Sequence, residues 1–238
     1  MTKYILFDLD GTLLPMDQED FTKAYFKALS AAMYPHGYEP QLLIKAVWNG
    51  MKAMVENNGE RTNEEAFWDS FRKDYGEKAV NDKPEFDKFY KTGFNETRSV
   101  CGFNPKAKET INMIKKLNIK TAVATLPAFP SQAIASRIEW SGCLVDDFEF
   151  YTSYESCSYC KPNIGYYKEI LSRLNCNAED CLMVGNNVDE DMIAEKVGFK
   201  VFLLTDCLIN EHNKDISLFP NGSFDELQEY ILKSNTDY

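Results

Sequence analysis

Near its amino terminus the chain reads Tyr4-Ile5-Leu6-Phe7-Asp8-Leu9-Asp10-Gly11-Thr12-Leu13-Leu14. The short apolar run is typical of a buried strand in a parallel sheet, and Gly11 permits a sharp turn after it. Because side chains alternate along a strand, Asp8 and Asp10 point the same way just beyond its carboxyl end, where open α/β sheets bind ligands. Two carboxylates so close repel each other unless a cation lies between them or one is protonated. The pair indicates a Mg²⁺ site, a nucleophile beside an acid or base, or both; the alternative is a pair of turn-forming aspartates.

Two later segments also place polar groups at the ends of predicted elements. The β-rich run 119–125 ends at Thr125, and its hydroxyl together with the backbone N–H of Leu126 can donate to a phosphoryl oxygen, unless this is an ordinary turn. Lys161 comes directly before Pro162, which we expect to be the first residue of a helix. Its ammonium can serve a phosphate and the crowded carboxylates; the alternative is a solvated surface lysine.

A further strand, predicted over 181–184, leads into Gly185-Asn186-Asn187-Val188-Asp189-Glu190-Asp191. The segment is polar and contains oxygen ligands of the kind that Mg²⁺ prefers. Taken alone, it is also compatible with a simple turn between a strand and a helix.

These four segments together resemble the motifs of the haloacid dehalogenase-like (HAD) phosphohydrolase superfamily, in the order in which that family has them. FDLDGTLL resembles its first motif, and Thr125, Lys161 and the segment 185–191 match the three others. The resemblance covers residues 1–15 and roughly 100–205. One position departs from it: Asn186 stands where the family has an aspartate, and an amide oxygen brings no charge to a metal. Asp189 and Asp191 are the candidates to compensate.

The resemblance implies a role for each matched residue. Asp8 is the nucleophile that forms an aspartyl-phosphate, and Asp10 is the general acid and base. Thr125 and Leu126 hold the phosphoryl oxygens, and Lys161 offsets their negative charge. The implied ligands of a Mg²⁺ cofactor are Asp8, the backbone carbonyl of Asp10, and Asn186 or Asp191.

The function we expect is a Mg²⁺-dependent phosphohydrolase that acts on a small phosphorylated metabolite. Two alternatives stay open: a hexose-phosphate mutase resembling β-phosphoglucomutase, and a non-catalytic protein that binds a phosphate ligand. A haloacid dehalogenase is disfavoured, because Asp10 is the phosphatase signature and dehalogenases lack it.

The pattern of elements predicts an α/β fold, a doubly wound parallel sheet in a Rossmann-like core formed by residues 1–15 and 100–238. Residues 16–99 show apolar spacing typical of four helices, and the resemblance implies an inserted, all-helical cap of the C1 type. A lid beside the nucleophile can exclude water and select the substrate. Lys23, Trp48, Asn49 and Lys52 are candidates to face the site.

In the core we expect strands at 119–125, 148–151, 181–184 and 200–204, and helices at 105–117, 131–140, 162–174, 189–197 and 223–234.

The bulk properties of the 238 residues narrow the class of protein. A net charge of −11 argues against nucleic acid or an anionic membrane as a partner. No leader or long apolar run is visible, and seven cysteines suit a reducing compartment, so we expect a cytoplasmic protein. For Cys157 and Cys160 we expect free thiols, because the spacing of the other cysteines fits a zinc site poorly. The oligomeric state cannot be read from the sequence.

Overall fold

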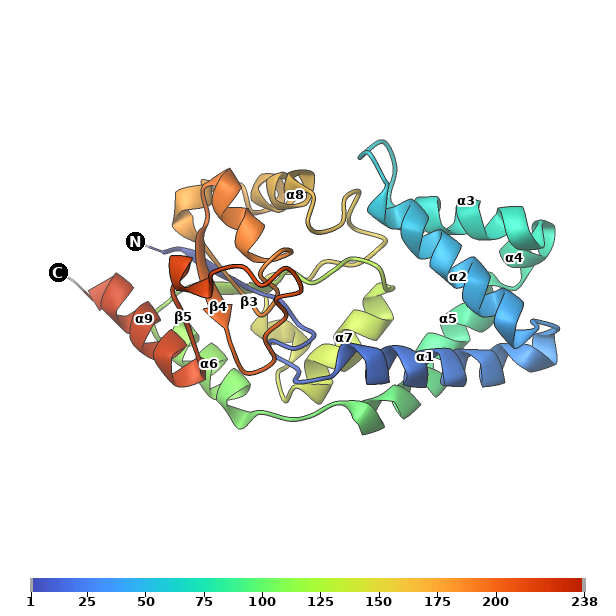
Figure 1. Cartoon of the computed structure of the whole chain (residues 1–238), viewed down its shortest axis with the longest axis horizontal. Helices are drawn as coiled ribbons and strands as arrows, with labels where there is room; N and C mark the ends of the chain where they lie inside the picture. Colours follow the sequence, from blue (N-terminus) through green and yellow to red (C-terminus); the bar gives the residue numbers. More distant parts are fainter. Residues whose placement is uncertain (1, 237–238) are drawn as a thin grey trace.

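The computed structural model describes residues 2–236 and contains a five-stranded parallel sheet (Figure 1). The strands lie in the order β2-β1-β3-β4-β5. Their bounds are Tyr4–Phe7 (β1), Lys120–Val123 (β2), Cys181–Gly185 (β3), Lys200–Leu204 (β4) and Asn221–Gly222 (β5). Ile5 of β1 pairs with Thr121 on one side and with Leu182 on the other, and it is fully buried. The predicted parallel α/β fold is confirmed.

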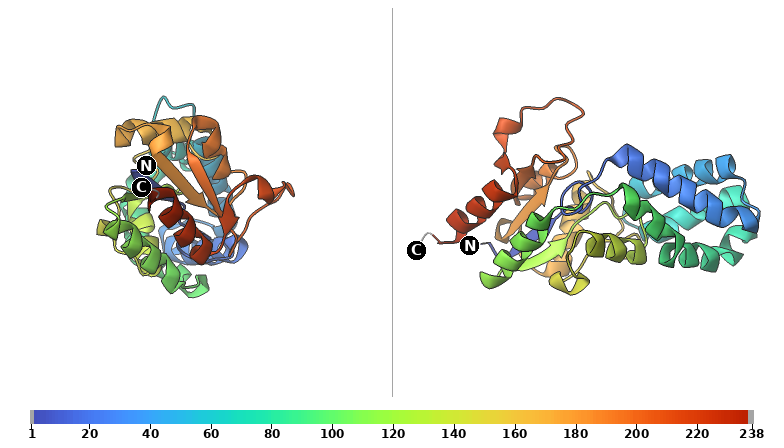
Figure 2. Two further views of the ribbon diagram at one scale, coloured as in Figure 1. Left: turned by 90° about the vertical axis from the view of Figure 1, so that its left-hand side faces the viewer. Right: turned by 90° about the horizontal axis from the view of Figure 1, so that it is seen from below.

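Helices cover both faces of this sheet (Figure 2). α8 (Ile164–Leu174) and the 3₁₀ helix η5 (Met192–Val197) share an apolar core with Leu6. The other face, with Ile5 and Phe7, packs against α6 (Pro105–Lys116), α7 (Ser131–Trp140) and α9 (Phe224–Thr236). Successive residues of β1 therefore enter two different cores, as the alternation of side chains along a strand requires.

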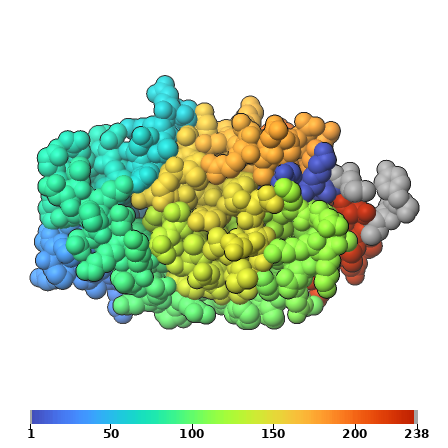
Figure 3. All heavy atoms as spheres, turned by 180° about the vertical axis from the view of Figure 1, so that it is seen from behind, coloured from blue at the N-terminus to red at the C-terminus, as the bar shows by residue number. Residues whose placement is uncertain are grey.

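Residues 18–100, called here the helical segment, lie at one end of the sheet (Figures 1 and 3). Among the described residues, this segment contains helices and no strand. Its elements are α1 (Gln18–Met33), the 3₁₀ helix η1 (Tyr34–His36), α2 (Pro40–Val55), α3 (Asn63–Tyr75), α4 (Glu77–Asn81), α5 (Lys83–Lys91) and the 3₁₀ helix η2 (Gly93–Val100). Caps begin the main helices: the Asp17 side chain accepts from two backbone N–H groups of α1, and Thr62 and Glu65 form a capping box at α3.

Main-chain hydrogen bonds join the helical segment and the core at the two places described next, in addition to ring contacts such as that of Phe94 with Trp140. The chain passes between the core and the helical segment twice, at residues 15–16 and 101–102, and these two stretches pair with each other. Met16 forms a bridge with Cys101, and the Gly102 N–H donates to the Pro15 carbonyl at 2.7 Å. On the other side, the buried Asn63 donates from its backbone N–H to the Cys157 carbonyl at 2.8 Å. Hydrogen bonds thus hold the segment against the core on both sides.

One predicted strand, over 148–151, is wrong, and one observed strand was not predicted. Residues 148–151 run beside β2, and the Glu149 N–H donates to the Thr121 carbonyl, but only Tyr151 forms a bridge, with Val123. The pairing ends there because the Tyr154 N–H already bonds the Phe129 carbonyl in the loop after β2. The fifth strand is instead β5, a two-residue strand that the sequence pattern did not indicate.

Two predicted helix starts are also wrong. α8 begins at Ile164 rather than Pro162, because the Asn163 side chain accepts from the Gly165 N–H and makes Asn163 the cap. Residues 189–191 precede η5 instead of starting a helix, since the Asn187 side-chain oxygen accepts from the N–H groups of Asp189 and Glu190 and holds a turn. Every helix in the described part of the chain is too short or too polar to span a lipid bilayer.

The aromatic core of the helical segment should dominate its stability. Phe71 is fully buried and its ring contacts those of Tyr38, Phe67 and Phe86. We expect Phe71→Ala to lower the free energy of unfolding by about 3–5 kcal/mol, measured by urea denaturation, because it leaves a cavity among these rings. Leu42→Ala is the control: Leu42 is 59% exposed, and its loss should change the free energy by about 0.5 kcal/mol or less. Equal effects of the two changes would contradict the packing described.

Candidate active site

The sheet order brings three of the singled-out residues to neighbouring strand ends. Asp8 directly follows β1, Thr125 lies two residues beyond β2, and Asn186 directly follows β3. The ladder continues to this edge: the Asp8 N–H donates to the Val184 carbonyl at 2.8 Å. Because β1 lies between β2 and β3, the three side chains gather at one edge of the sheet.

Lys161 reaches this edge from the loop before α8 and is almost completely buried. Its Nζ donates to Asp8 Oδ1 at 3.0 Å and to Asp191 Oδ1 at 2.6 Å. Burial alone lowers the pKa of Lys161, but the carboxylates of Asp191 and Asp8 outweigh it and raise this pKa well above its ordinary value. Lys161 is therefore a fixed positive charge between two carboxylates.

Asp191 has both side-chain oxygens engaged. Oδ1 accepts from Lys161, and Oδ2 accepts from the Asn187 N–H at 3.0 Å. Its carboxylate packs so closely on the backbone of Gly185 that a Cβ at Gly185 would lie 2.1 Å from Oδ2. A glycine at the end of β3 is thus required for Asp191 to reach Lys161.

Asn186 is fixed from both ends of its amide. Its Nδ2 donates to the Cys207 carbonyl at 2.6 Å, and its Oδ1 accepts from the Thr12 hydroxyl at 3.0 Å. The same hydroxyl lies 3.4 Å from Asp8 Oδ2, so Asp8 and Asn186 present oxygens to one small region. Gly11, with φ +82°, makes room for this, because a Cβ there would lie 2.3 Å from Asn186 Nδ2.

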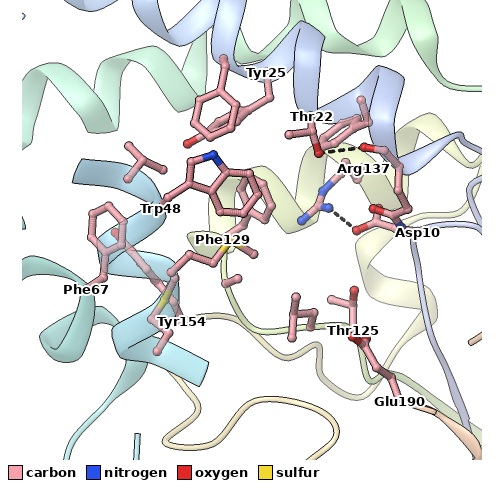
Figure 4. Close-up of a pocket in the computed structure, with 18 of the residues that line it drawn as sticks. Asp10, Thr22, Tyr25, Trp48, Phe67, Thr125, Phe129, Arg137, Tyr154 and Glu190 are labelled. Carbon is pink, nitrogen blue, oxygen red and sulfur yellow. Dashed lines mark hydrogen bonds and ion pairs between the residues drawn. The ribbon is translucent and has the colours of Figure 1, made fainter. Parts of the chain in front are cut away.

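Asp10 forms an ion pair that the sequence analysis missed. Its Oδ2 accepts from Nη1 of Arg137, a residue of α7 that is 1% exposed (Figure 4). Burial raises the pKa of Asp10, and the charge of Arg137 opposes that rise. The signal was present in the sequence: Arg137 falls on the buried face of its helix together with Ala133, Ile134 and Ile138, where an unpaired charge is rare.

A cavity of about 290 Å³ opens in front of these groups, between the core and the helical segment. Asp8, Asp10, Thr125 and Asn186 line its core side, together with Leu126. Figure 4 shows Tyr25, Trp48 and Phe67 of the helical segment opposite Asp10 and Thr125. The charged groups of the described lining all lie on the core side, which also contributes Phe129 and Tyr154, whereas the helical segment contributes most of the aromatic rings.

Several candidate residues lie elsewhere. Trp48 lines the cavity, but Lys23 pairs with Glu19 on the surface, Lys52 pairs with Glu56, and Asn49 bonds Asp74. Asp189 is turned away from these residues: its Oδ2 lies 2.8 Å from His212 Nδ1, and its Oδ1 pairs with Lys214.

The cysteines form no disulfide in the structure, where all seven are free. Within residues 2–236, no three side chains of histidine, cysteine, aspartate or glutamate converge as metal ligands. A metal at this site would therefore also depend on amide or main-chain oxygens.

The family profile of haloacid dehalogenase-like hydrolases matches residues 2–197. The chain belongs to this family. No curated protein matches the sequence. Open α/β sheets bind ligands at the carboxyl ends of their strands, and this is the edge where Asp8, Thr125 and Asn186 gather.

Solved structures of this family share the fold over nearly the whole chain. A 2-haloacid dehalogenase from Pseudomonas syringae pv. Tomato DC3000 aligns with a TM-score of 0.63 at 17% identity, covering 98% of this chain and 100% of its own. A predicted phosphatase from Clostridium acetobutylicum gives 0.59 at 19% identity, covering 98% and 99%. A HAD phosphatase from Thermococcus onnurineus gives 0.58 at 15%, covering 97% and 98%. At these identities the likeness concerns the fold alone.

Glu190 lines the cavity and should make stability depend on pH. Burial raises the pKa of Glu190 to about 7, against the opposing charge of Lys161 and with help from Asp191 and Asp8. The folded protein therefore binds the proton of Glu190 more tightly than the unfolded chain does, and this proton binding stabilises the fold. The stabilisation is complete below the ordinary pKa of 4.5 and disappears as pH rises through 7. We expect Glu190→Gln to be more stable than the parent at pH 8, by on the order of 2 kcal/mol, and nearly equal below pH 4.5.

The measurement is urea unfolding of metal-free protein in EDTA across this pH range. Glu211→Gln is the matched control, because Glu211 lies at the exposed rim of the same cavity. A stability difference for Glu190→Gln that does not change with pH would contradict the assignment.

Proposed function

We propose that this protein is a Mg²⁺-dependent phosphohydrolase that removes phosphate from a small phosphorylated metabolite through an aspartyl-phosphate on Asp8. The observation that supports this best is the second acid: Asp10 lines the same cavity as Asp8, whose carboxylate is 3.0 Å from Lys161 Nζ. Displacing an alcohol from phosphorus needs a nucleophile, a proton for the leaving oxygen and positive charge near the phosphoryl group. A halide leaves without needing a proton, so Asp10 would have no role as an acid in a dehalogenase.

In the first half-reaction, the Asp8 carboxylate attacks phosphorus and the bond from phosphorus to the ester oxygen breaks. Asp10 gives its proton to the departing oxygen, so the leaving group is a neutral alcohol. Arg137 occupies Oδ2 of Asp10, so Oδ1 is the oxygen available for this proton transfer. Oδ1 has no hydrogen-bond partner within residues 2–236. Lys161, the Thr125 hydroxyl and the Leu126 N–H offset the charge on the phosphoryl oxygens.

In the second half-reaction, Asp10 takes a proton from a water molecule, which attacks phosphorus. The bond between phosphorus and Asp8 breaks, inorganic phosphate leaves, and Asp8 is again a carboxylate. Asp191 has no role at phosphorus in this scheme. It is a positioning residue that holds Lys161 through the 2.6 Å ion pair.

The residues present suit Mg²⁺, which takes oxygen ligands and keeps several waters. Asp8 Oδ2 and Asn186 Oδ1 both contact the Thr12 hydroxyl, so two oxygens already face one point, and the backbone carbonyl of Asp10 is the third candidate. Asp191 is a weaker candidate because both its oxygens accept hydrogen bonds. When bound, the ion would neutralise charge on the phosphoryl group and keep Asp8 ionised.

We further propose that residues 16–99 act as a cap of the C1 type over a core formed by 1–15 and 100–238. The pairing of Met16 with Cys101 suits a hinge where the two chain crossings meet. The helical wall of the cavity supports a role in excluding water and selecting the leaving group. A hexose-phosphate mutase is less well supported, because among the described cavity residues the helical segment contributes no lysine or arginine for a second phosphate.

The roles of Asp8 and Asp10 can be separated with acetyl phosphate, whose leaving group barely needs protonation. We expect Asp8→Asn to lower phosphate release by about 10³-fold or more on every substrate. Asp10→Asn should cost roughly 10²–10⁴-fold on an alkyl phosphate and much less on acetyl phosphate. Phosphate release is measured with Mg²⁺ and with EDTA. The proposed hydrolysis is wrong if Asp8→Asn keeps more than a few per cent of the activity, or if no ester is turned over.

Asn186 should limit the affinity for the metal. Asn186→Asp adds one negative charge facing Mg²⁺, and we expect the Mg²⁺ dissociation constant from calorimetry to fall by roughly ten-fold. The same change removes the amide donor to the Cys207 carbonyl, so the metal-free protein should lose about 1–3 kcal/mol of stability. Asp189→Asn is the control, because Asp189 faces His212 instead. An unchanged Mg²⁺ affinity in Asn186→Asp would remove Asn186 from the proposed ligands.

A further inference from the structure

The cavity has walls of two different chemical kinds. Its core side carries the ionisable groups, among them Asp8, Asp10 and Arg137. Its other side comes from the helical segment and, within the described residues, contains no charged side chain. A leaving group attached to a phosphate on Asp8 would extend toward this second wall, since both line the same cavity. Figure 4 shows Trp48 and Phe67 of this wall across the cavity from Asp10.

Aromatic rings from four helices dominate the second wall. They come from α1, α2, α3 and α5 and include Tyr25, Phe26, Trp48, Phe67 and Tyr90. Trp48 is 48% exposed although its ring packs against Phe26, with 5.5 Å between the ring centroids. Large apolar faces left open around a cavity are typical of a site for an apolar ligand.

The hydroxyl groups on this wall are already engaged, whereas the indole N–H of Trp68, also in the lining, has no hydrogen-bond partner within residues 2–236. The hydroxyls of Tyr25 and Tyr90 bond each other at 2.8 Å, and the Thr22 hydroxyl donates to the Gln18 carbonyl at 2.7 Å. A sugar would bring several hydroxyls to a surface with few free partners. Each hydroxyl buried without a partner would weaken binding roughly ten-fold.

Charge in the cavity also works against an anionic leaving group. Arg137 is the one cation among the described residues of the lining, and Asp10 balances its charge through Nη1, although Nη2 of Arg137 has no hydrogen-bond partner within residues 2–236. Glu211 adds negative charge at the rim. A leaving group with a carboxylate or a second phosphate would therefore meet the negative charge of Glu211 and no cation whose charge is not already balanced by a carboxylate.

We propose that the cavity selects phosphate monoesters of an uncharged aromatic or arylalkyl alcohol, with the ring bound against Trp48 and its neighbours. This substrate class rests on the proposed function for its turnover, but its binding can be tested alone. The volume of about 290 Å³ suits one or two rings, since a cavity of about 150 Å³ already holds benzene. Flat rings also match walls of aromatic side chains, which pair in stacked or edge-on arrangements.

The binding test uses Asp8→Asn, to prevent turnover, and calorimetry with four ligands: 2-naphthyl phosphate, hexyl phosphate, glucose 6-phosphate and 2-phosphoglycolate. We expect 2-naphthyl phosphate to bind at least ten-fold more tightly than the sugar phosphate and the phosphorylated acid. Equal or tighter binding of either of these would overturn the proposal. Hexyl phosphate binding as tightly as the naphthyl ester would overturn the requirement for a ring.

Turnover tests the wall itself, through the ratio of kcat/KM for 2-naphthyl phosphate to kcat/KM for acetyl phosphate. We expect Trp48→Ala to lower this ratio about ten-fold and Trp48→Phe to restore most of it. Tyr34→Ala is the control, because Tyr34 is an exposed aromatic residue of the helical segment outside the cavity lining. A ratio unchanged by Trp48→Ala would overturn the role of this wall.

The two proposals fail in different ways. If acetyl phosphate and all esters are inert while 2-naphthyl phosphate still binds selectively, the hydrolase is wrong and the ligand class stands. If acetyl phosphate is hydrolysed but the naphthyl ester has no preference, the hydrolase stands and the ligand class is wrong.

Discussion

The buried ammonium of Lys161 between Asp8 and Asp191 is the interaction on which the rest of the site depends. A lysine taken out of water is costly unless carboxylates compensate it, and two buried carboxylates are equally costly without a cation. The three groups come from the end of β1, the loop before α8 and the turn before η5, so their charges balance only when all three segments are in place. Folding of the core and assembly of the site are therefore coupled.

Close packing behind these charges leaves little freedom in the backbone. Gly11 and Gly185 are the two positions where a side chain would collide with a polar group of the site, Asn186 in one case and Asp191 in the other. The amide of Asn186 is in turn held by Thr12 and by the Cys207 carbonyl. Side chains held this closely keep their positions without rearranging, which is the condition that electrostatic catalysis requires in the proposed reaction.

The cavity in front of the charges has the opposite character. Its far wall is aromatic and uncharged in the described part of the chain, and it belongs to the helical segment. In the proposed phosphohydrolase this division would separate two tasks: the core side would meet the phosphoryl group, which any phosphate ester shares, and the helical side would meet the leaving group, which differs between esters. Arg137 lies at the boundary, since its guanidinium bonds Asp10 of the core and also lies over the ring of Phe21 in α1, 5.7 Å from the centroid.

The sequence by itself determined the fold class and the chemistry available at the strand ends. Alternating apolar runs and helical periodicities predict the parallel sheet, because burial on both faces leaves a continuous apolar strand such as Tyr4–Phe7. Short, local features were less predictable: β5 has only two residues, α8 starts where the Asn163 side chain caps it, and η5 starts after the turn that the Asn187 side chain holds.

Only the tertiary structure decided which charges meet. Asp191 is far from Lys161 and Arg137 is far from Asp10 along the chain, and no periodicity connects them; their pairing follows from the strand order and from the packing of α7. The aromatic wall has the same origin. Helical spacing predicts that Trp48 and Phe67 lie on apolar faces, but whether a face closes a core or lines a cavity depends on how four helices pack together, and local sequence does not encode that arrangement.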